Sequence, residues 1–583
     1  MTATSTRFRW VVFPGELSEE PSRDLVGGKA WSLWRMQALG LRVPPAFVIT
    51  TAACTAFFAG RHVLPDGLDE EITAGIRYLE KELDRTFGGR ERPLLVSVRS
   101  GAAVSMPGMM DTVLNLGMNP DTEAALAAEA GDPDFAAEVH RRFCAFYGRL
   151  VLGCTEDLDE LQSVAAVRAA VRADTGEDVP IDPWQQLHAA VAAVFRSSRS
   201  RRAIAYRKHY GIPDDLGTAV TIQAMVFGNL DDRSGTGVLF SRNPITGERA
   251  PYGEYLPRGQ GEDVVSGRVT PRPLDYLAEH EPEVYAELIA AAERLDDDGR
   301  DAQDLEFTIQ RGTLYLLQAR PAKRTARAAV RIAVALVDEG VITPAEAVRR
   351  VTSEQVRVLL RPRLASGVAD GATVLASGHP ASPGVATGLA VATPEEAQRI
   401  PGAILVRRST SPEDVHGMIA AAAVVTEQGG ATSHAAVVSR ALDTPCVVGC
   451  GDGTIDALVG RTVTVDATAG RVYAEELPTE AVTEADDPDL RRLTEWARAC
   501  APVTVVAPEE PCPEPVFDAD RIPPEELSDH VPPIPPGTRS VRGALFGTDE
   551  GVRAACDAGV EVIASRHRLP VLLAAIAHTG GGS

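Results

Sequence analysis

The chain is poor in basic residues and aromatics, has few cysteines, and contains no long apolar run. Its 58 Lys and Arg residues face 81 Asp and Glu residues, a net charge of −23, which disfavours nucleic acid and anionic membranes as partners. No window approaches the ~18 apolar residues that a membrane span needs. The eight cysteines show no C-x-x-C spacing, which indicates reduced structural thiols. We therefore expect a cytoplasmic protein with no nucleic-acid and no membrane partner.

The length of 583 residues predicts about four domains of roughly 150 residues each. One region stands out as a break between them, because 11 of the 35 residues from Pro502 to Pro536 are proline. Several glutamates add like charge to the same region. Such a composition is typical of an extended or disordered linker.

The most informative string, residues 429–440, places a histidine at the start of a helix. Residues 421–426 have the pattern of a short buried strand, and residues 434–442 have helix-forming composition, with Thr432 or Ser433 available as N-cap. His434 would then lie in the first helical turn. Free N–H groups and the helix dipole at that position favour a neutral, nucleophilic imidazole and stabilise a phosphoryl group bound to it. An ordinary capped helix with a half-buried histidine is the alternative.

Two segments nearer the N-terminus have phosphate-binding features. Gly27-Gly28-Lys29 precedes a helical pattern, so backbone N–H groups and the lysine could meet a phosphate, although a plain helix start fits as well. The apolar strand 94–101 delivers Arg99 just before the methionine-rich run 105–112. An arginine beside a mobile loop suits phosphate clamping and lid closure, and a methionine cluster in the core is the alternative. Residues 221–227 alternate like a strand and lead to the run 234–244, whose small residues would let the backbone approach a ligand. Residues 252–255 and 260–267 are expected to continue a sheet.

Residues 304–320 read as two strands joined by a Gln-Arg-Gly turn. Strand alternation places Asp304 and Glu306 on one face and the apolar residues between and after them on the other. A turn centred on Arg311 would set Asp304 opposite Gln318. Two carboxylates and an amide oxygen suit a Mg²⁺ ion that holds nucleotide phosphates. A solvated hairpin face is the alternative.

The wording of residues 432–447, Thr-Ser-His-Ala-Ala-Val-Val followed by Thr-Pro-Cys-Val, resembles the phosphohistidine signature of the pyruvate, phosphate dikinase family of phosphoenolpyruvate-utilising enzymes. The resemblance implies that His434 is the phosphorylated residue. It also implies that Thr432 is the target of a regulatory kinase/phosphorylase, since a second charge beside the nucleophile would repel phosphate. The chain departs from the family at Glu427-Gln428, where a basic residue is usual, and at Ala431, where methionine is usual.

The upstream segments, taken in order, resemble the ATP-grasp half of the same family over roughly the first 340 residues. The resemblance implies that Lys29 and Arg99 bind ATP phosphates and that Asp304 and Glu306 hold Mg²⁺ and the nucleotide. It further implies that Gln318 and Arg320 complete the nucleotide site. Arg407 would contact the phosphoryl group on His434.

The fold class expected from the resemblance is α/β and α+β multidomain, with an ATP-grasp nucleotide-binding domain and a swivelling β/β/α phosphohistidine domain. A Pro/acid-rich linker and a small α/β tail complete it. The expected boundaries are 1–340 for the ATP-grasp domain, 341–371 for a helical linker that begins as early as Ala326, 372–476 for the swivelling domain, 477–540 for the Pro/acid-rich linker and 541–583 for a short α/β remnant or docking element.

The resemblance implies that ATP and phosphate charge His434 and that AMP and pyrophosphate are released, with Mg²⁺ as cofactor and pyruvate or phosphoenolpyruvate as the family's acceptor. The residues after 476 are too few to close the α/β barrel that binds this acceptor in the family, because a (β/α)₈ fold needs at least ~200 residues. We therefore expect a partial reaction, or a separate barrel chain as partner. The alternatives are a non-catalytic phosphocarrier or regulatory paralogue and a phosphotransferase with a different acceptor.

Overall fold

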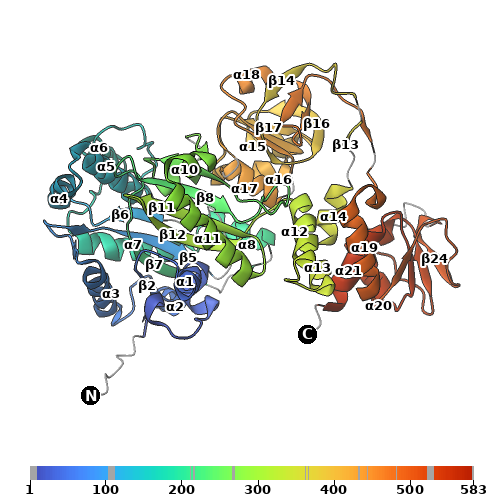
Figure 1. Cartoon of the computed structure of the whole chain (residues 1–583), viewed down its shortest axis with the longest axis horizontal. Coiled ribbons are helices and arrows are strands. Elements are labelled where there is room, and N and C mark those ends of the chain that lie inside the picture. The colour runs from blue at the N-terminus through green and yellow to red at the C-terminus, as the bar shows by residue number, and fades with distance from the viewer. Residues whose placement is uncertain are drawn as a thin grey trace.

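The computed structural model describes the chain in segments, and all structural statements below concern these residues: 9–102, 112–210, 212–213, 217–265, 269–360, 363–365, 367–430, 433–442, 444–480, 482–521 and 531–580. Residues 105–111 of the predicted lid loop and Thr432 lie outside them. The predicted mixed α/β multidomain architecture is confirmed, because several separate sheets are each covered by helices (Figure 1). In the described residues, no helix combines the length and apolar character needed to cross a bilayer.

The N-terminal region contains an antiparallel five-stranded sheet in the order β1-β2-β7-β5-β6. Its buried core consists of alternate strand residues and the apolar faces of the surrounding helices. The strands are β1 Val11–Val12, β2 Ala46–Ile49, β5 Val96–Gly101, β6 Thr112–Leu116 and β7 Ala219–Ala224. The helices are α1 Arg23–Ala38, α2 Thr51–Ala59, α3 Leu68–Leu83, α4 Pro120–Ala130, α5 Pro133–Leu150, α6 Val164–Thr175, α7 Pro183–Ser197 and α8 Arg201–Tyr210. A two-stranded ladder is formed by β3 Thr86–Phe87 and β4 Pro93–Leu94.

A second antiparallel sheet, in the order β10-β9-β8-β11-β12, faces the first across helix α1. Leu33 and Met36 of α1 belong to the core of this second sheet, while other parts of α1 pack on β5 and β7 of the first. The strands are β8 Gly235–Phe240, β9 Tyr252–Pro257, β10 Arg272–Pro273, β11 Gln303–Gln310 and β12 Thr313–Pro321. The helices are α9 Gly261–Val265, α10 Asp275–His280 and α11 Pro282–Gly299. We call the two sheets with their helices the nucleotide-binding unit, after the expected ATP-grasp domain.

One local prediction in this unit is wrong. The residues after β9 were expected to continue the sheet, but residues 261–265 form helix α9. The backbone N–H of Gln260 donates to the carboxylate of Asp263, and the N–H of Asp263 donates back to the carbonyl of Gln260. This reciprocal turn starts a helix where the apolar pair Val264-Val265 favoured a strand.

Three linker helices follow: α12 Ala326–Asp338, α13 Pro344–Arg350 and α14 Ser353–Leu359. The hydroxyl of Thr325 accepts the N–H of Ala328, so α12 begins at Ala326 as predicted. Thr343 and Thr352 form capping boxes that start the next two helices. These side-chain caps satisfy N–H groups that the first turn of a helix leaves unpaired.

The region from β14 to β21 forms an eight-stranded sheet in the order β14-β21-β20-β16-β17-β18-β19-β15. Its centre, β16 to β19, is parallel, and both flanks are antiparallel. The strands are β14 Val374–Ser377, β15 His379–Ser382, β16 Val385–Val391, β17 Ile404–Arg407, β18 Ala423–Thr426, β19 Cys446–Val448, β20 Thr462–Asp466 and β21 Arg471–Tyr473. The helices are α15 Pro394–Arg399, α16 Val415–Ala420, α17 His434–Ala441 and α18 Thr454–Leu458. We call this the histidine domain.

The chain enters and leaves the histidine domain through two strands that pair with each other. Strand β13 Arg363–Leu364 runs antiparallel to β22 Thr479–Glu480. The guanidinium of Arg363 forms an ion pair of 2.9 Å with Glu480. The histidine domain is therefore inserted into the rest of the molecule through one narrow double connection (Figure 1).

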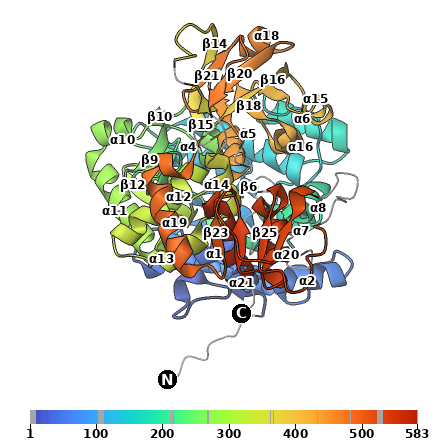
Figure 2. The ribbon, with the colours of Figure 1, turned by 90° about the vertical axis from the view of Figure 1, so that its right-hand side faces the viewer.

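The C-terminal region packs on the linker helices, and Figures 1 and 2 show α19 and α21 beside α12 to α14. One buried core joins the two segments. The region has a parallel four-stranded sheet in the order β23-β26-β25-β24. Its strands are β23 Thr504–Val506, β24 Val516–Asp518, β25 Ser540–Arg542 and β26 Val562–Ala564, and its helices are α19 Pro488–Cys500, α20 Asp549–Asp557 and α21 Arg568–Gly580. Within its described residues, the segment 477–540 that was expected as a Pro/acid-rich linker thus contains helix α19 and strands β22, β23 and β24, while the domain boundaries themselves stay predictions.

Candidate functional site

Lys29 is positioned by a close contact between α1 and the end of β5. Gly27 has a positive φ of 76° within α1, and a Cβ there would lie 1.9 Å from the carbonyl oxygen of Gly101. The N–H of Gly28 donates to the carbonyl of Ala102 at 2.9 Å. Only glycine fits this approach and this φ. The predicted Gly-Gly turn therefore holds Lys29 beside the strand end that delivers Arg99.

The electrostatic surroundings of Lys29 are unusual for a lysine. Burial, together with the neighbouring guanidinium groups of Arg99 and Arg320, lowers the pKa of Lys29 to about 7, although Glu306 opposes the shift. A lysine with such a pKa gains its proton when an anion arrives. This behaviour suits a residue that meets phosphate.

Arg99 connects the two sheets of the nucleotide-binding unit. Its guanidinium lies 3.3 Å from the amide oxygen of Gln223 on β7. It lies 3.4 Å from Glu306 on β11 and 3.4 Å from the amide oxygen of Gln318 on β12. Its side chain is 14% exposed. The structure therefore brings Arg99, Glu306 and Gln318 together, and it adds Gln223, to which the sequence pattern gave no role.

The β11–β12 hairpin has a different register from the predicted one. Asp304 pairs with Arg320, and Glu306 pairs with Gln318. The turn contains two residues, Arg311 and Gly312, which both have positive φ, so the pairing is centred half a residue beyond Arg311. A bulge after Glu306 shifts the register further. The predicted faces are confirmed, because the apolar side chains of β11 are buried in the core of the second sheet.

The observed register places the guanidinium of Arg320 directly beside the buried carboxylate of Asp304. Nε of Arg320 donates to Oδ2 of Asp304 at 2.8 Å, and Nη2 of Arg320 lies 4.0 Å from Glu306. Burial raises the pKa of Asp304 despite this partner, and Asp304 in turn raises the pKa of Arg320. Among the described residues, Oδ1 of Asp304 is buried and has no hydrogen-bond partner.

The donor set fits a Mg²⁺ ion bound together with a nucleotide. Asp304 and Glu306 lie on one face, two residues apart, and offer hard oxygen ligands, including the buried Oδ1 of Asp304. Mg²⁺ is usually held by one or two carboxylates and completes its octahedron with substrate phosphates and water. No cluster of three or more acidic, His or Cys ligands occurs in the part of the chain that the structure describes.

His434 begins helix α17, as predicted, and follows Ser433 at the N-cap. Its Nδ1 lies 3.0 Å from the hydroxyl of Thr410. Within the described residues, its Nε2 is buried and has no hydrogen-bond partner. Burial lowers the pKa of His434, and the carboxylates of Asp414 and Glu413 only partly oppose this. The imidazole is therefore neutral at neutral pH, and Thr410 is a neighbour that the sequence pattern did not single out as a partner.

Arg407 lies beside this histidine's acidic neighbours. Its Nη2 is 3.2 Å from Oδ1 of Asp414, and its Nη1 donates to the carbonyl of Ala392. Glu413 forms an ion pair of 3.1 Å with Arg202 of α8. Both carboxylates near His434 thus have an arginine partner, which limits their repulsion of a phosphoryl group.

Glu427, at which the sequence departs from the family that it resembles, has a structural role. Its Oε1 accepts the backbone N–H groups of Gly453 and Ile455, both at 3.0 Å. These groups belong to the first turn of α18. A carboxylate at a helix N-terminus is favourable. The negative charge of Glu427 therefore stabilises the N-terminus of α18.

Comparison with known families identifies two regions of the chain. Residues 23–282 match the model "Pyruvate phosphate dikinase, AMP/ATP-binding domain". Residues 399–470 match the model "PEP-utilising enzyme, mobile domain". The first region covers helices α1 to α10 and strands β2 to β10, and the second covers strands β17 to β20 with helices α16 to α18. Strands β11, β12 and β16 lie outside both matches.

Curated relatives extend the similarity across most of the chain. The chain is 41% identical to pyruvate, phosphate dikinase of Clostridium symbiosum, over 84% of the chain and 60% of that protein. It is 42% identical to pyruvate, phosphate dikinase of Rhizobium meliloti, over 85% of the chain and 61% of the relative. For the chloroplastic protein of Flaveria pringlei the identity is 45%, over 77% and 50%. The chain thus spans about half to three fifths of the length of these relatives.

Proposed function

Because the chain belongs to the pyruvate, phosphate dikinase family through its nucleotide-binding and mobile domains, we propose that it transfers a phosphoryl group from ATP to His434. The observation that carries the proposal is the state of the imidazole. Nδ1 is held near Thr410, while Nε2 is buried without a described partner and the ring is neutral at pH 7. A neutral imidazole with one oriented and one open nitrogen is suited to nucleophilic attack.

The reaction proceeds in two steps. With its proton on Nδ1, His434 attacks the β-phosphorus of ATP through Nε2, and the bond from that phosphorus to the α,β-bridging oxygen breaks so that AMP leaves. An oxygen of inorganic phosphate then attacks the outer phosphorus of the pyrophosphoryl group. The bond from that phosphorus to its bridging oxygen breaks, pyrophosphate leaves, and the inner phosphoryl group stays on Nε2.

Three cationic side chains neutralise the triphosphate: Lys29, Arg99 and Arg320. Their convergence on Glu306 and Asp304 supports this assignment. Asp304 and Glu306, with the amide of Gln318 nearby, would hold Mg²⁺, which withdraws charge from the phosphate oxygens when bound. Positioning and charge neutralisation are the main requirements of phosphoryl transfer.

Arg407 acts at the histidine end of the reaction. It is paired with Asp414 in the present state, and we assign it to the phosphoryl group once His434 carries one. The dianionic group would compete with Asp414 for the guanidinium, because arginine binds phosphate oxygens with charge-assisted hydrogen bonds. Thr432, outside the described residues, stays the proposed site of regulatory phosphorylation by a kinase/phosphorylase.

The final acceptor is proposed from the relatives, which are named for pyruvate and phosphate. The side chains assigned above serve the nucleotide half-reaction, and pyruvate or phosphoenolpyruvate would be bound elsewhere, with a separate barrel chain as the proposed partner. Adding pyruvate to the phosphorylated protein tests this step. Loss of label from His434 with formation of labelled phosphoenolpyruvate supports the proposed acceptor. Retention of the label when both pyruvate and the separate barrel chain are present contradicts it.

ATP labelled in the β position tests the nucleotide half-reaction. We expect acid-labile, base-stable label on the protein, and we expect phosphate to release the γ-phosphoryl group as pyrophosphate while the β-label stays. His434→Asn should abolish labelling. His416→Asn is the matched control, because His416 lies in the same domain and contacts only Glu395 among the ion pairs of the described residues. Labelling from the γ position alone, or labelling that survives His434→Asn, would contradict the proposal.

A further inference from the structure

Helix α17 carries a second side chain that reaches the nucleotide-binding unit. Arg440 lies six residues after His434 on α17 and is 1% exposed. Its guanidinium carbon lies 5.8 Å from the ring centroid of Phe240 on β8. Phe240 pairs with Asp304 on the neighbouring strand β11. Arg440 therefore extends from the histidine domain to the strand pair that carries the proposed metal ligand.

The charges around Arg440 come mainly from the nucleotide-binding unit. Burial lowers the pKa of Arg440, while Tyr252, Asp304, Cys446 and Glu254 act to raise it, and of these only Cys446 belongs to the histidine domain. Within its own domain, Nη1 of Arg440 donates a hydrogen bond of 3.3 Å to the carbonyl of Ala381. Removing an arginine from water is costly unless opposite charge faces it. Here the facing acidic groups lie on β9 and β11, across the domain boundary.

Glu254 also meets the loop that precedes His434. A Cβ added at Gly430 would lie 2.3 Å from Oε1 of Glu254, so the carboxylate of β9 lies directly against this glycine. The same acidic group thus touches the loop at one end of α17 and acts electrostatically on Arg440 at the other end. Both ends of the histidine helix are aligned by the nucleotide-binding unit.

Two further contacts hold the same pair of domains together at a distance from Arg440. Arg202 of α8 pairs with Glu413 at 3.1 Å. Val415 packs against an apolar cluster of the nucleotide-binding unit formed by Ala102, Tyr206 and Ile212. The histidine domain is therefore docked on the nucleotide-binding unit through several separate contacts, as Figure 1 shows for α16 and α17 beside β8 and α8.

We propose that Arg440 is a positioning residue that seats the histidine domain on the nucleotide-binding unit, through Phe240 and the carboxylates of Asp304 and Glu254, so that His434 faces the phosphate-binding side chains. This inference rests on the proposed function. Because a buried guanidinium is stabilised only where carboxylates face it, Arg440 selects the docked orientation over other placements of the inserted domain. It acts through the position of His434 and not on the reacting atoms.

The test compares Arg440→Met with the matched control Arg399→Met, an exposed arginine of the same domain. Docking is measured by a short bis-maleimide cross-link between cysteines placed at Arg202 and Glu413, quantified as cross-linked tryptic peptide in both backgrounds. Transfer is measured as the single-turnover rate of His434 labelling from β-labelled ATP. We expect Arg440→Met to lower both the cross-link yield and the rate by tenfold or more. The dissociation constant for ATP should change less than twofold, and Arg399→Met should change nothing.

A second variant separates docking from folding of the histidine domain. Glu254→Gln removes the facing charge from the nucleotide-binding unit and leaves the histidine domain untouched. Like Arg440→Met, it should lower both the cross-link yield and the transfer rate. Chemical phosphorylation of His434 by phosphoramidate should stay at the wild-type rate. Unchanged cross-link yields in both variants would overturn the inference. If wild-type protein takes no label from ATP, the proposed function fails, and the cross-link comparison still decides the role of Arg440.

Discussion

The hydroxyl of Thr410 lies 3.0 Å from Nδ1 of His434 and leaves Nε2 as the open nitrogen of the ring. Thr410 follows β17 and His434 begins α17, so two segments of the histidine domain together fix the orientation of one imidazole. A histidine that must react through one nitrogen benefits from a partner on the other.

Thr410→Val should slow the labelling of His434 from ATP by about tenfold, because misplacing a reacting group can cost up to about 100-fold in rate. Thr410→Ser keeps the hydroxyl and should retain a rate close to wild type. Single-turnover labelling measures both. Equal rates for the valine and serine variants would show that the hydroxyl does not orient the ring.

Nucleotide binding should take up a proton at alkaline pH because of Lys29. The pKa of this lysine is lowered to about 7 in the free protein, so the amine is neutral above pH 7 and phosphate oxygens would favour its charged form. Calorimetry of ATP binding at pH 8 in buffers of different ionisation enthalpy should report uptake of up to one proton, and affinity should fall as the pH rises above 7. In Lys29→Met the uptake should disappear, whereas its persistence would assign the proton to another group.

The same shift makes a prediction for stability. The folded pKa of Lys29 lies below the value of 10.5 for an unfolded chain, so the unfolded state binds more protons between these two values. The contribution of Lys29 to the free energy of unfolding therefore decreases as the pH falls from 10.5 to about 7 and is constant below that. The unfolding free energy of wild type minus that of Lys29→Met, measured by urea denaturation, should decrease across this window and level off below pH 7. A difference that does not vary with pH would contradict the shift.

Gly27→Ala should impair ATP binding as well as stability, because the new Cβ would lie 1.9 Å from the carbonyl of Gly101 and must push β5 away from α1. Gly67→Ala is the matched control. Gly67 also has positive φ, at 81°, but among the described residues, its chain neighbours aside, no atom lies within 4 Å of the position that its Cβ would take. The control should cost about 1 kcal/mol from backbone strain alone and leave ATP affinity intact. Similar losses in both variants would show that the close approach to Gly101 is unimportant.

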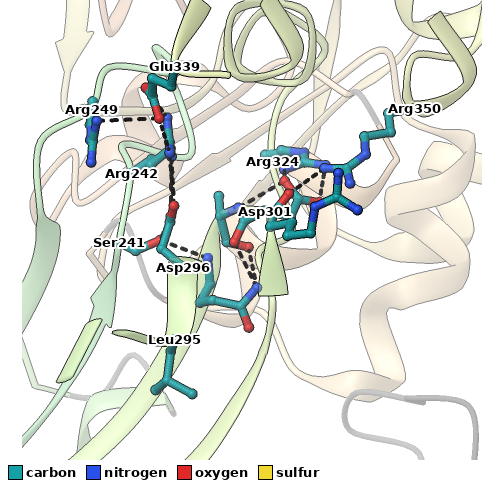
Figure 3. Close-up of polar contacts among 12 residues, drawn as sticks. Ser241, Arg242, Arg249, Leu295, Asp296, Asp301, Arg324, Glu339 and Arg350 are labelled. Atoms are coloured by element: carbon teal, nitrogen blue, oxygen red, sulfur yellow. Dashed lines mark hydrogen bonds and ion pairs between the residues drawn. The ribbon is translucent and has the colours of Figure 1, made fainter. Parts of the chain in front are cut away.

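A buried ion cluster joins the nucleotide-binding unit to the first linker helix (Figure 3). Arg242, whose side chain is 2% exposed, forms ion pairs of 2.8 Å with Asp296 of α11 and with Glu339 at the end of α12. Arg242→Met should lower the free energy of unfolding by about 3–5 kcal/mol, since it leaves two carboxylates without their central partner. Denaturant unfolding of the full chain measures this.

The control for that experiment is Arg249→Met. Arg249 contacts Glu339 at 3.4 Å, but its side chain is 63% exposed, so its loss should cost about 1 kcal/mol or less. A nearby ion pair between Arg324 and Asp301 (Figure 3) remains in both variants. Comparable losses at positions 242 and 249 would contradict the importance of burial in this cluster.

Local structure around the site could be predicted where neighbouring residues decide it. The start of α12 at Ala326 follows from its capping residue, and the two faces of β11 follow from strand alternation, both of which act over a few residues. Helix α17 also starts at His434 as predicted, although the side chain of its N-cap Ser433 makes no capping hydrogen bond. The hairpin register could not be obtained in this way. A two-residue turn and a bulge after Glu306 decided it, and the bulge depends on packing that the sequence does not display.

The sequence by itself determined which candidate functional groups this protein carries, because a histidine at a helix start and the lysine, arginine and carboxylates of the nucleotide-binding unit are properties of short motifs. Only the tertiary structure decided how these parts meet. It paired Arg320 with Asp304, set Thr410 against His434, placed Arg440 beside Phe240 and joined the linker helices to the C-terminal sheet in one core. The physical reason is that these relationships depend on the burial of charge and apolar surface between segments far apart in the chain, which no local pattern encodes.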